Sequence, residues 1–106
     1  MTPEARYEEL ALRMKGKAGV THVTEGKGFG SSGQLKVQGR IFAMLVRGEL
    51  VLKLPRDRVE ELIATGHGKN FDAGKGKPMR EWFVLSPTSS KRWEALTQEA
   101  LVFVKG

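Results

Sequence analysis

Hydrophobic residues near the start of the chain recur every three or four positions, which is the period of a helix. The positions that form this stripe are Tyr7, Leu10, Ala11 and Met14. Thr2 can cap the helix with its hydroxyl, and Pro3 suits the first helical position because no backbone N–H is needed there. Gly16 is expected to end the helix in the left-handed conformation.

Beyond Gln34 the hydrophobic pattern changes to that of strands. Three strands are expected, at residues 35–37, 40–47 and 50–54. The connections Gln38-Gly39 and Gly48-Glu49 are too short for the crossover that parallel strands need, so these strands should form an antiparallel meander. A shorter alternation at residues 20–23 is a candidate for one more strand.

The second half of the chain alternates between helix and strand signals. A helix should include Pro55 in its first turn and end at Gly66, and a strand is expected at residues 81–85. The hydrophobic residues of a last helix are Trp93, Leu96, Ala100 and Phe103. We therefore predict one α+β domain of residues 1–106, in the order helix, strands, helix, strand, helix. Three amphipathic helices should cover one face of an antiparallel meander sheet, which gives two layers.

Positive charge is concentrated in two glycine-containing segments, Arg13–Lys27 and Gly66–Arg80. Each segment carries four Lys or Arg residues and one carboxylate, so the two together account for the whole formal charge of +6. The residues that could contact an anion or a nucleic-acid backbone are Lys27, Lys69, Lys75, Lys77 and Arg80. The alternative is that these are solvated side chains of surface loops.

Composition excludes several classes of chemistry. The chain has no cysteine, which rules out disulfides, thiolate metal sites and cysteine nucleophiles. Its longest apolar run, Ile41–Val46, is too short to span a membrane, so we expect no membrane association and a cytoplasmic location. The two histidines, His22 and His67, lack metal-ligand spacing, so no metal is expected.

Two glycine-rich runs invite comparison with phosphate-binding loops. Gly28–Gly33 has the pattern G-x-G-x-x-G, but a dinucleotide site needs a helix after it, and residues 35–37 continue as a strand. Glycines that permit a bulge or a loop against the sheet are the favoured explanation. The run Gly74–Pro78 also fails as a phosphate loop, because Gly76 stands where Ser or Thr would bind magnesium.

No residue pattern identifies a reaction. Asp57, Glu60 and Glu61 share a helix with two arginines and suit a surface ion-pair face. The serines, Ser89 among them, lack an identifiable base, and His67 suits a helix exit better than catalysis. The aromatic residues that could stack on nucleobases, although core packing is favoured, are Trp82, Phe83 and Trp93. We therefore expect no catalytic residue and no cofactor.

Four segments of the chain form a series that is informative in its order and spacing. They are Gly26-Lys27-Gly28-Phe29-Gly30, Lys36-Val37-Gln38-Gly39-Arg40-Ile41-Phe42-Ala43, Leu52-Lys53-Leu54 and Gly76-Lys77-Pro78-Met79-Arg80-Glu81-Trp82. The series resembles the N-terminal domain of the TfoX/Sxy competence-regulator family and spans nearly the whole chain. The resemblance implies a two-layer domain with an antiparallel sheet, similar to secretion-chaperone and YjbR-like folds, in which dimers are common. It implies a regulatory or binding role and provides no catalytic residues.

Three functions of different classes remain open at this point. The leading hypothesis is a non-enzymatic bacterial cytoplasmic protein of the TfoX N-terminal class that acts through protein association, with a partner or as a homodimer. The alternative is a nucleic-acid or anion-binding module that uses the basic Gly/Lys loops. The least favoured is a small phosphate- or nucleotide-dependent enzyme that uses Gly28–Gly33.

Overall fold

The computed structural model describes residues 2–17, 19–23, 34–71, 79–86, 89 and 92–106. The elements in chain order are α1 (Pro3–Lys15), β1 (Val20–Val23), β2 (Gln34–Val37), β3 (Arg40–Val46), β4 (Glu49–Lys53), α2 (Arg56–Ala64), β5 (Gly68–Phe71), β6 (Met79–Leu85) and α3 (Trp93–Lys105). The predicted order of helices and strands is confirmed, and the candidate strand at residues 20–23 is present as β1. One strand, β5, was not predicted.

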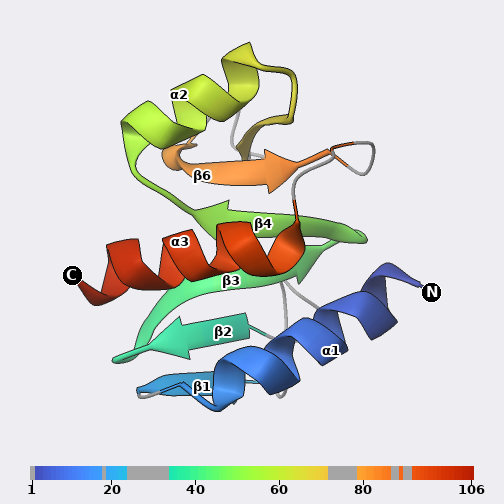
Figure 1. Cartoon of the computed structure of the whole chain (residues 1–106), viewed down its shortest axis with the longest axis vertical. Coiled ribbons are helices and arrows are strands. Elements are labelled where there is room, and N and C mark those ends of the chain that lie inside the picture. Colours follow the sequence, from blue (N-terminus) through green and yellow to red (C-terminus); the bar gives the residue numbers. More distant parts are fainter. Residues whose placement is uncertain (1, 18, 24–33, 72–78, 87–88, 90–91) are drawn as a thin grey trace.

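The three helices lie on one face of a six-stranded sheet, as Figure 1 shows. The strands run in the order β1-β2-β3-β4-β6-β5, and every neighbouring pair is antiparallel. Helix α1 contacts β1, α3 lies mainly over β3 and β4, and α2 covers β5 and β6. The predicted α+β architecture with an antiparallel sheet is therefore confirmed. No helix within the described ranges is long and apolar enough to cross a membrane.

Helix α1 begins as its sequence predicts and ends differently. The Thr2 hydroxyl accepts a hydrogen bond of 3.1 Å from the Ala5 N–H, and the predicted hydrophobic stripe is buried. The prediction that Gly16 adopts the left-handed conformation is wrong, because its φ is −72°. The helix closes instead with a tight turn in which the Lys17 N–H donates to the Met14 carbonyl at 3.0 Å. The left-handed residue comes later, at Gly19, where φ is 80°.

Two hairpins join the strands of the meander. In the first, Gln38 and Gly39 have φ values of 52° and 78°, and in the second, Arg47 and Gly48 have values of 52° and 79°. Two successive left-handed residues are typical of the tight turns whose twist matches that of paired strands. The second turn lies one residue earlier than predicted, since Glu49 already belongs to β4.

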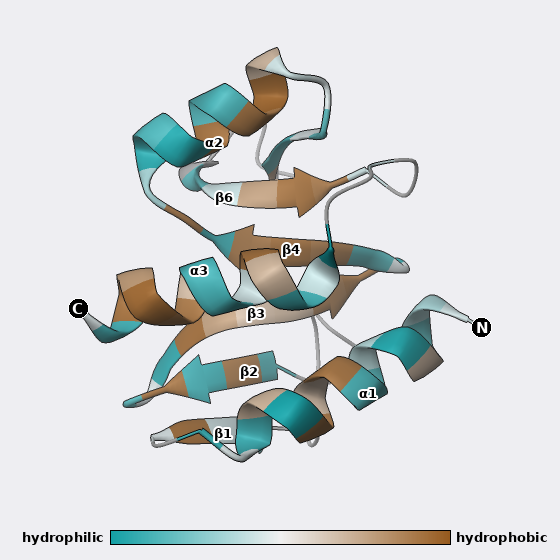
Figure 2. Ribbon diagram, in the orientation of Figure 1, coloured by the Kyte–Doolittle hydropathy of each residue, from teal (hydrophilic) through white to brown (hydrophobic). Residues whose placement is uncertain are grey.

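The core lies mainly between the helices and the sheet. Figure 2 shows how strongly hydrophobic β3 and β4 are. On β4, Leu50 and Leu52 are buried on the helix side, while Val51 belongs to a second cluster on the opposite face. In β3 a register shift gives the strand one extra residue opposite β2, and both Phe42 and Ala43 join the helix-side cluster. This bulge adds a large aromatic side chain to the core beneath the helices.

Strand β5 follows directly from the way α2 ends. The left-handed Gly66 donates to the Ile63 carbonyl at 3.0 Å, and His67 donates to the Leu62 carbonyl at 2.9 Å. This Schellman motif turns the chain back toward the sheet. Gly68 then pairs with Leu85 at the edge of the sheet. The segment had been interpreted as part of a basic loop, because glycine and lysine are poor strand formers.

Candidate functional site

The basic residues singled out in the sequence are only partly described by the structure. Lys27, Lys75 and Lys77 lie outside the described residues, as do the glycine-rich runs that contain or adjoin them. Arg80 belongs to β6, but its side chain is also outside the description. Lys69 is exposed on the edge strand β5 and pairs with Val84, on the sheet face opposite the helices.

The three aromatic residues considered for base stacking have different environments. Phe83 is fully buried in the helix-side core, as predicted. Trp82 is half-buried on the opposite face, where the Lys53 ammonium lies 5.7 Å from its ring centroid. Trp93 is half-buried at the start of α3, and the Arg6 guanidinium carbon lies 4.3 Å from its ring centroid. Trp93 also lines a groove.

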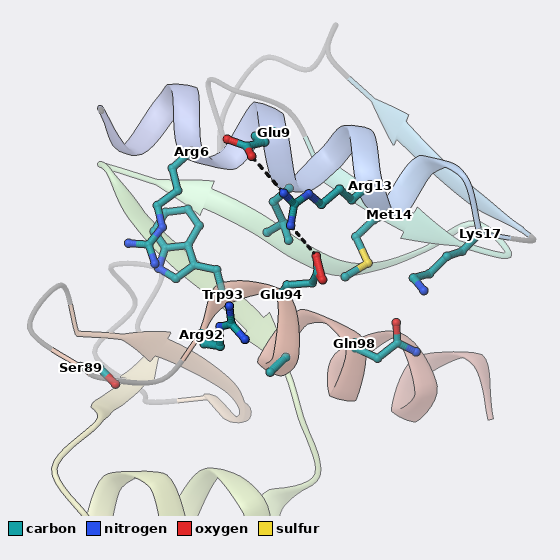
Figure 3. A pocket seen from close by; sticks show the side chains of 12 residues that line it. Arg6, Glu9, Arg13, Met14, Lys17, Ser89, Arg92, Trp93, Glu94 and Gln98 are labelled. Atoms are coloured by element: carbon teal, nitrogen blue, oxygen red, sulfur yellow. Dashed lines mark hydrogen bonds and ion pairs between the residues drawn. The ribbon is translucent and has the colours of Figure 1, made fainter.

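A groove of about 1180 Å³ separates α1 from α3 on the helical face of the molecule (Figure 3). Its floor includes the buried side chains of Leu10 and Met14. Four basic side chains and two carboxylates line it, and these are Arg6, Arg13, Lys17, Arg92, Glu9 and Glu94. The groove therefore combines an apolar base with walls of net positive charge.

One end of the groove is positive through two arginines and a helix terminus. Arg6 lies over the face of Trp93, an arrangement that leaves the in-plane N–H donors of its guanidinium available to a ligand. Arg92 is the N-cap residue of α3 and is exposed, and its side chain makes no capping hydrogen bond. The partial positive charge of a helix N-terminus adds to that of the two side chains.

The middle of the groove is crossed by an ion-pair network. Arg13 on α1 contacts Glu9 at 3.1 Å and, across the groove, Glu94 on α3 at 3.0 Å (Figure 3). The hydrogen bond to Glu94 and the charges of both carboxylates raise the pKa of Arg13 above its ordinary value. The three side chains are 61%, 51% and 54% exposed, so water screens the network and its contacts can exchange at low cost.

Lys17, just after α1, and Gln98, on α3, line the end of the groove beyond Arg13 (Figure 3). Lys17 lies two residues beyond the end of α1 and is exposed. Its ammonium group makes no ion pair within the described part of the chain, and the same is true of Arg6 and Arg92. The positive charges at the two ends of the groove are thus available to a ligand.

Ser89, which also lines the groove, has a histidine neighbour that the sequence did not reveal. The Nδ1 atom of His67 lies 2.8 Å from the Ser89 hydroxyl oxygen. The His67 carbonyl also accepts a hydrogen bond of 2.9 Å from the Ser86 N–H. These contacts join the exit of α2 to the segment that precedes α3. Within the described residues no carboxylate contacts His67, and so none of them supplies the orienting group of a catalytic triad.

His22, the other histidine, packs edge-on against Tyr7, with 6.1 Å between ring centroids. Among the residues described, no group of three His, Asp or Glu side chains lies close enough to hold a metal ion.

The groove residues were not recognised as a site in the sequence, although one signal for them exists. Arg6, Glu9 and Arg13 are spaced so that they share one side of α1. Nothing local in the sequence shows that Glu94 and Arg92 face these residues from α3. No protein-family model, curated protein or solved structure matches the chain.

Proposed function

We propose that this chain is a non-enzymatic bacterial regulatory domain that acts by binding another protein, in keeping with its resemblance to the TfoX N-terminal domain. The groove between α1 and α3 is the binding surface. The observation that carries the proposal is the set of unpaired cationic side chains around an apolar floor, within the part of the chain described. Charged groups around a hydrophobic centre are the usual composition of a protein-binding surface.

The dimensions of the groove favour a segment of a macromolecule over a small molecule. Small-molecule pockets have volumes of about 300–1,000 Å³ and enclose most of their ligand. The groove of about 1180 Å³ runs between two helices and is lined along its length by exposed charged side chains. A polypeptide segment could lie along it and contact both helices.

The chemistry of the groove favours binding over catalysis. The only nucleophile paired with a base among the described lining residues is Ser89, which His67 contacts through Nδ1. An acyl-transfer site also needs a group that orients the histidine, and no carboxylate of the described residues contacts His67.

In-cell photo-crosslinking from the groove tests this function. A photoreactive residue at Ala95, which is exposed and lines the groove, should capture a specific protein or a second copy of the chain. The same residue at Leu12, which is 73% exposed on α1 and outside the groove, is the matched control. Capture from Ala95 alone supports the proposal. Equal capture from both positions, or none from Ala95, contradicts it.

A second candidate function, nucleic-acid binding by the basic loops, has one observation in its favour. Lys53, Trp82 and the exposed Lys69 share the sheet face opposite the helices, which combines an aromatic ring with positive charge. Charge reversal of Lys75 and Lys77 should abolish a salt-dependent affinity for DNA if this function is correct. Unchanged DNA binding in that variant would remove the candidate.

A further inference from the structure

We propose that the occupant of the α1–α3 groove is an acidic segment of a partner protein, with carboxylates at both ends of the groove and apolar side chains between them. This inference rests on the proposed function and adds the chemical class of the partner. Arg6 and Arg92 hold one carboxylate and Lys17 holds another. The central part of the segment lies over Leu10 and Met14.

The arginine end of the groove is suited to a carboxylate in particular. The guanidinium of Arg6 is fixed against the Trp93 ring at 4.3 Å, so less side-chain freedom is lost when it binds a ligand. A guanidinium held by its face can donate two parallel N–H bonds to the two oxygens of a carboxylate. Arg92 and the N-terminus of α3 add positive charge beside it.

The middle of the groove disfavours a nucleic acid. Glu9 and Glu94 both line this part of the groove, and the carboxylate of each contacts Arg13 (Figure 3). A phosphate backbone carries charge at every nucleotide and would meet these two carboxylates. A peptide can instead present neutral or apolar side chains there, next to the exposed Ala95. The mixed charge of the walls therefore selects a polypeptide.

The bridge between Arg13 and Glu94 gives the inference a sharp test. Glu94 lies in the path of an acidic ligand and also occupies one side of the Arg13 guanidinium. Replacing Glu94 with glutamine removes a repulsive charge and leaves Arg13 freer to bind a ligand carboxylate. A variant that binds acidic peptides more tightly cannot be explained by damage to the fold.

The experiment measures fluorescence anisotropy with a set of labelled peptides in which paired glutamates are separated by increasing numbers of leucine and alanine residues. A matched set with glutamine in place of glutamate is the ligand control. We expect the glutamate set to bind more tightly by about tenfold at its best spacing. Arg92→Glu and Lys17→Glu should each weaken that binding by about fivefold or more, and Glu94→Gln should strengthen it about threefold.

Lys69→Glu is the matched protein control, because it makes the same charge change on the opposite face of the sheet. It should leave peptide affinity within about twofold of the unaltered chain. A loss as large as that of Arg92→Glu would show non-specific charge attraction and overturn the inference.

Two further probes separate the partner classes and the two proposals. Tighter binding of oligothymidylate or of phosphatidylglycerol vesicles than of the glutamate peptides, lost in Arg92→Glu, would assign the groove to a nucleic acid or a membrane and overturn the inference. If Ala95 captures a partner but no glutamate peptide binds, the acidic class is wrong and the proposed function stands. If Ala95 captures nothing, the proposed function itself fails.

Discussion

At Gly68 the fold depends on the absence of a single side chain. A Cβ atom there would lie 2.0 Å from the Val84 carbonyl oxygen and 2.5 Å from the Phe83 ring. Its φ is not in the left-handed region, so the requirement for glycine comes from close packing of β5 on β6 and not from backbone conformation. The sequence could not reveal this requirement, because the atoms that enforce it belong to a strand that is distant in sequence.

We expect Gly68→Ala to lower the free energy of unfolding by about 3 kcal/mol, because the added methyl group must displace backbone atoms. Urea denaturation measures the effect. Gly16→Ala is the matched control, since Gly16 has an ordinary helical φ and its nearest contact would be Arg13 O at 3.7 Å. That variant should be neutral or more stable by up to about 1 kcal/mol. Equal stabilities for the two variants would contradict the close contact between β5 and β6.

Tyr7 is among the largest fully buried side chains of the core, and it carries a polar hydroxyl group. Its hydroxyl donates to the Ala43 carbonyl at 3.4 Å, which is a long hydrogen bond. Burial raises the pKa of Tyr7 well above its ordinary value, because the phenolate would have to exist without solvation. The folded chain therefore holds this proton more tightly than the unfolded chain does.

This difference makes stability depend on pH under alkaline conditions. Below about pH 10, the pKa of an unfolded tyrosine, the stability that protonated Tyr7 contributes to the folded chain is fully present. As the pH rises above that value the unfolded chain loses its tyrosine proton first, and stability falls by about 1.4 kcal/mol for each pH unit. Tyr7→Phe should lose less stability than the unaltered chain between pH 10 and pH 11, in urea titrations at each pH. Parallel losses in the two proteins would show that Tyr7 is not the group responsible.

At the scale of elements, α2 and α3 are joined by a branched ion pair. The Arg58 guanidinium contacts Glu99 through two bonds, Nε to Oε1 at 2.8 Å and Nη2 to Oε2 at 3.1 Å, and also contacts Glu61. The predicted ion-pair face of α2 is confirmed for Glu60, which lies 3.3 Å from Arg56, and for Glu61, whereas Asp57 makes no ion pair with the described residues. The approach of α3 to α2 is what brings Glu99 to Arg58.

A double-mutant cycle of Arg58→Gln and Glu99→Gln should give a coupling energy of about 1 kcal/mol, because the pair is bidentate and partly shielded from water. The hydrogen bond to Glu99 raises the pKa of Arg58, which agrees with a favourable interaction between the two side chains. The same cycle on Arg56 and Glu60, within one helix, should give about 0.3–0.5 kcal/mol. A coupling no larger between Arg58 and Glu99 would show that the contact does not dock α2 on α3.

The elements that could be predicted are those with their own local signals. The hydroxyl of Thr2, the helical stripe ending at Met14 and the short connections of the meander each act within a few residues. Strand β5 has no such signal, since Gly68 and Lys69 form a strand only because the end of α2 delivers them to the free edge of β6. The groove was missed for the same reason, because one wall is α1 and the other is α3.

For the whole molecule, the order of strands determines which parts should open first. Strands β3 and β4 have neighbours on both sides and lie beneath α3, whereas β1 and β5 are the edges. Hydrogen exchange should therefore require global unfolding for the paired amides of β3 and β4. The free energy of opening for the paired amides of β1 and β5 should be lower by about 2 kcal/mol. Protection of β5 equal to that of β4 would contradict this arrangement.

The two-layer arrangement followed from sequence more readily than the arrangement of its functional surface. Leu50 and Leu52 indicate which face of β4 is covered, and they are buried there as expected. The path by which β6 enters between β4 and β5 is not encoded near either neighbour. Such long-range placement decides which charged side chains face one another.

The two walls of the groove come from the first and last helices of these 106 residues, which has a consequence during translation. The ribosome releases Arg6 and Arg13 early, and Arg92 and Glu94 only after every strand has been made. A nascent or prematurely terminated chain that lacks α3 would offer one wall and no groove. A partner that needs both walls would thus distinguish chains that include α3 from chains that lack it.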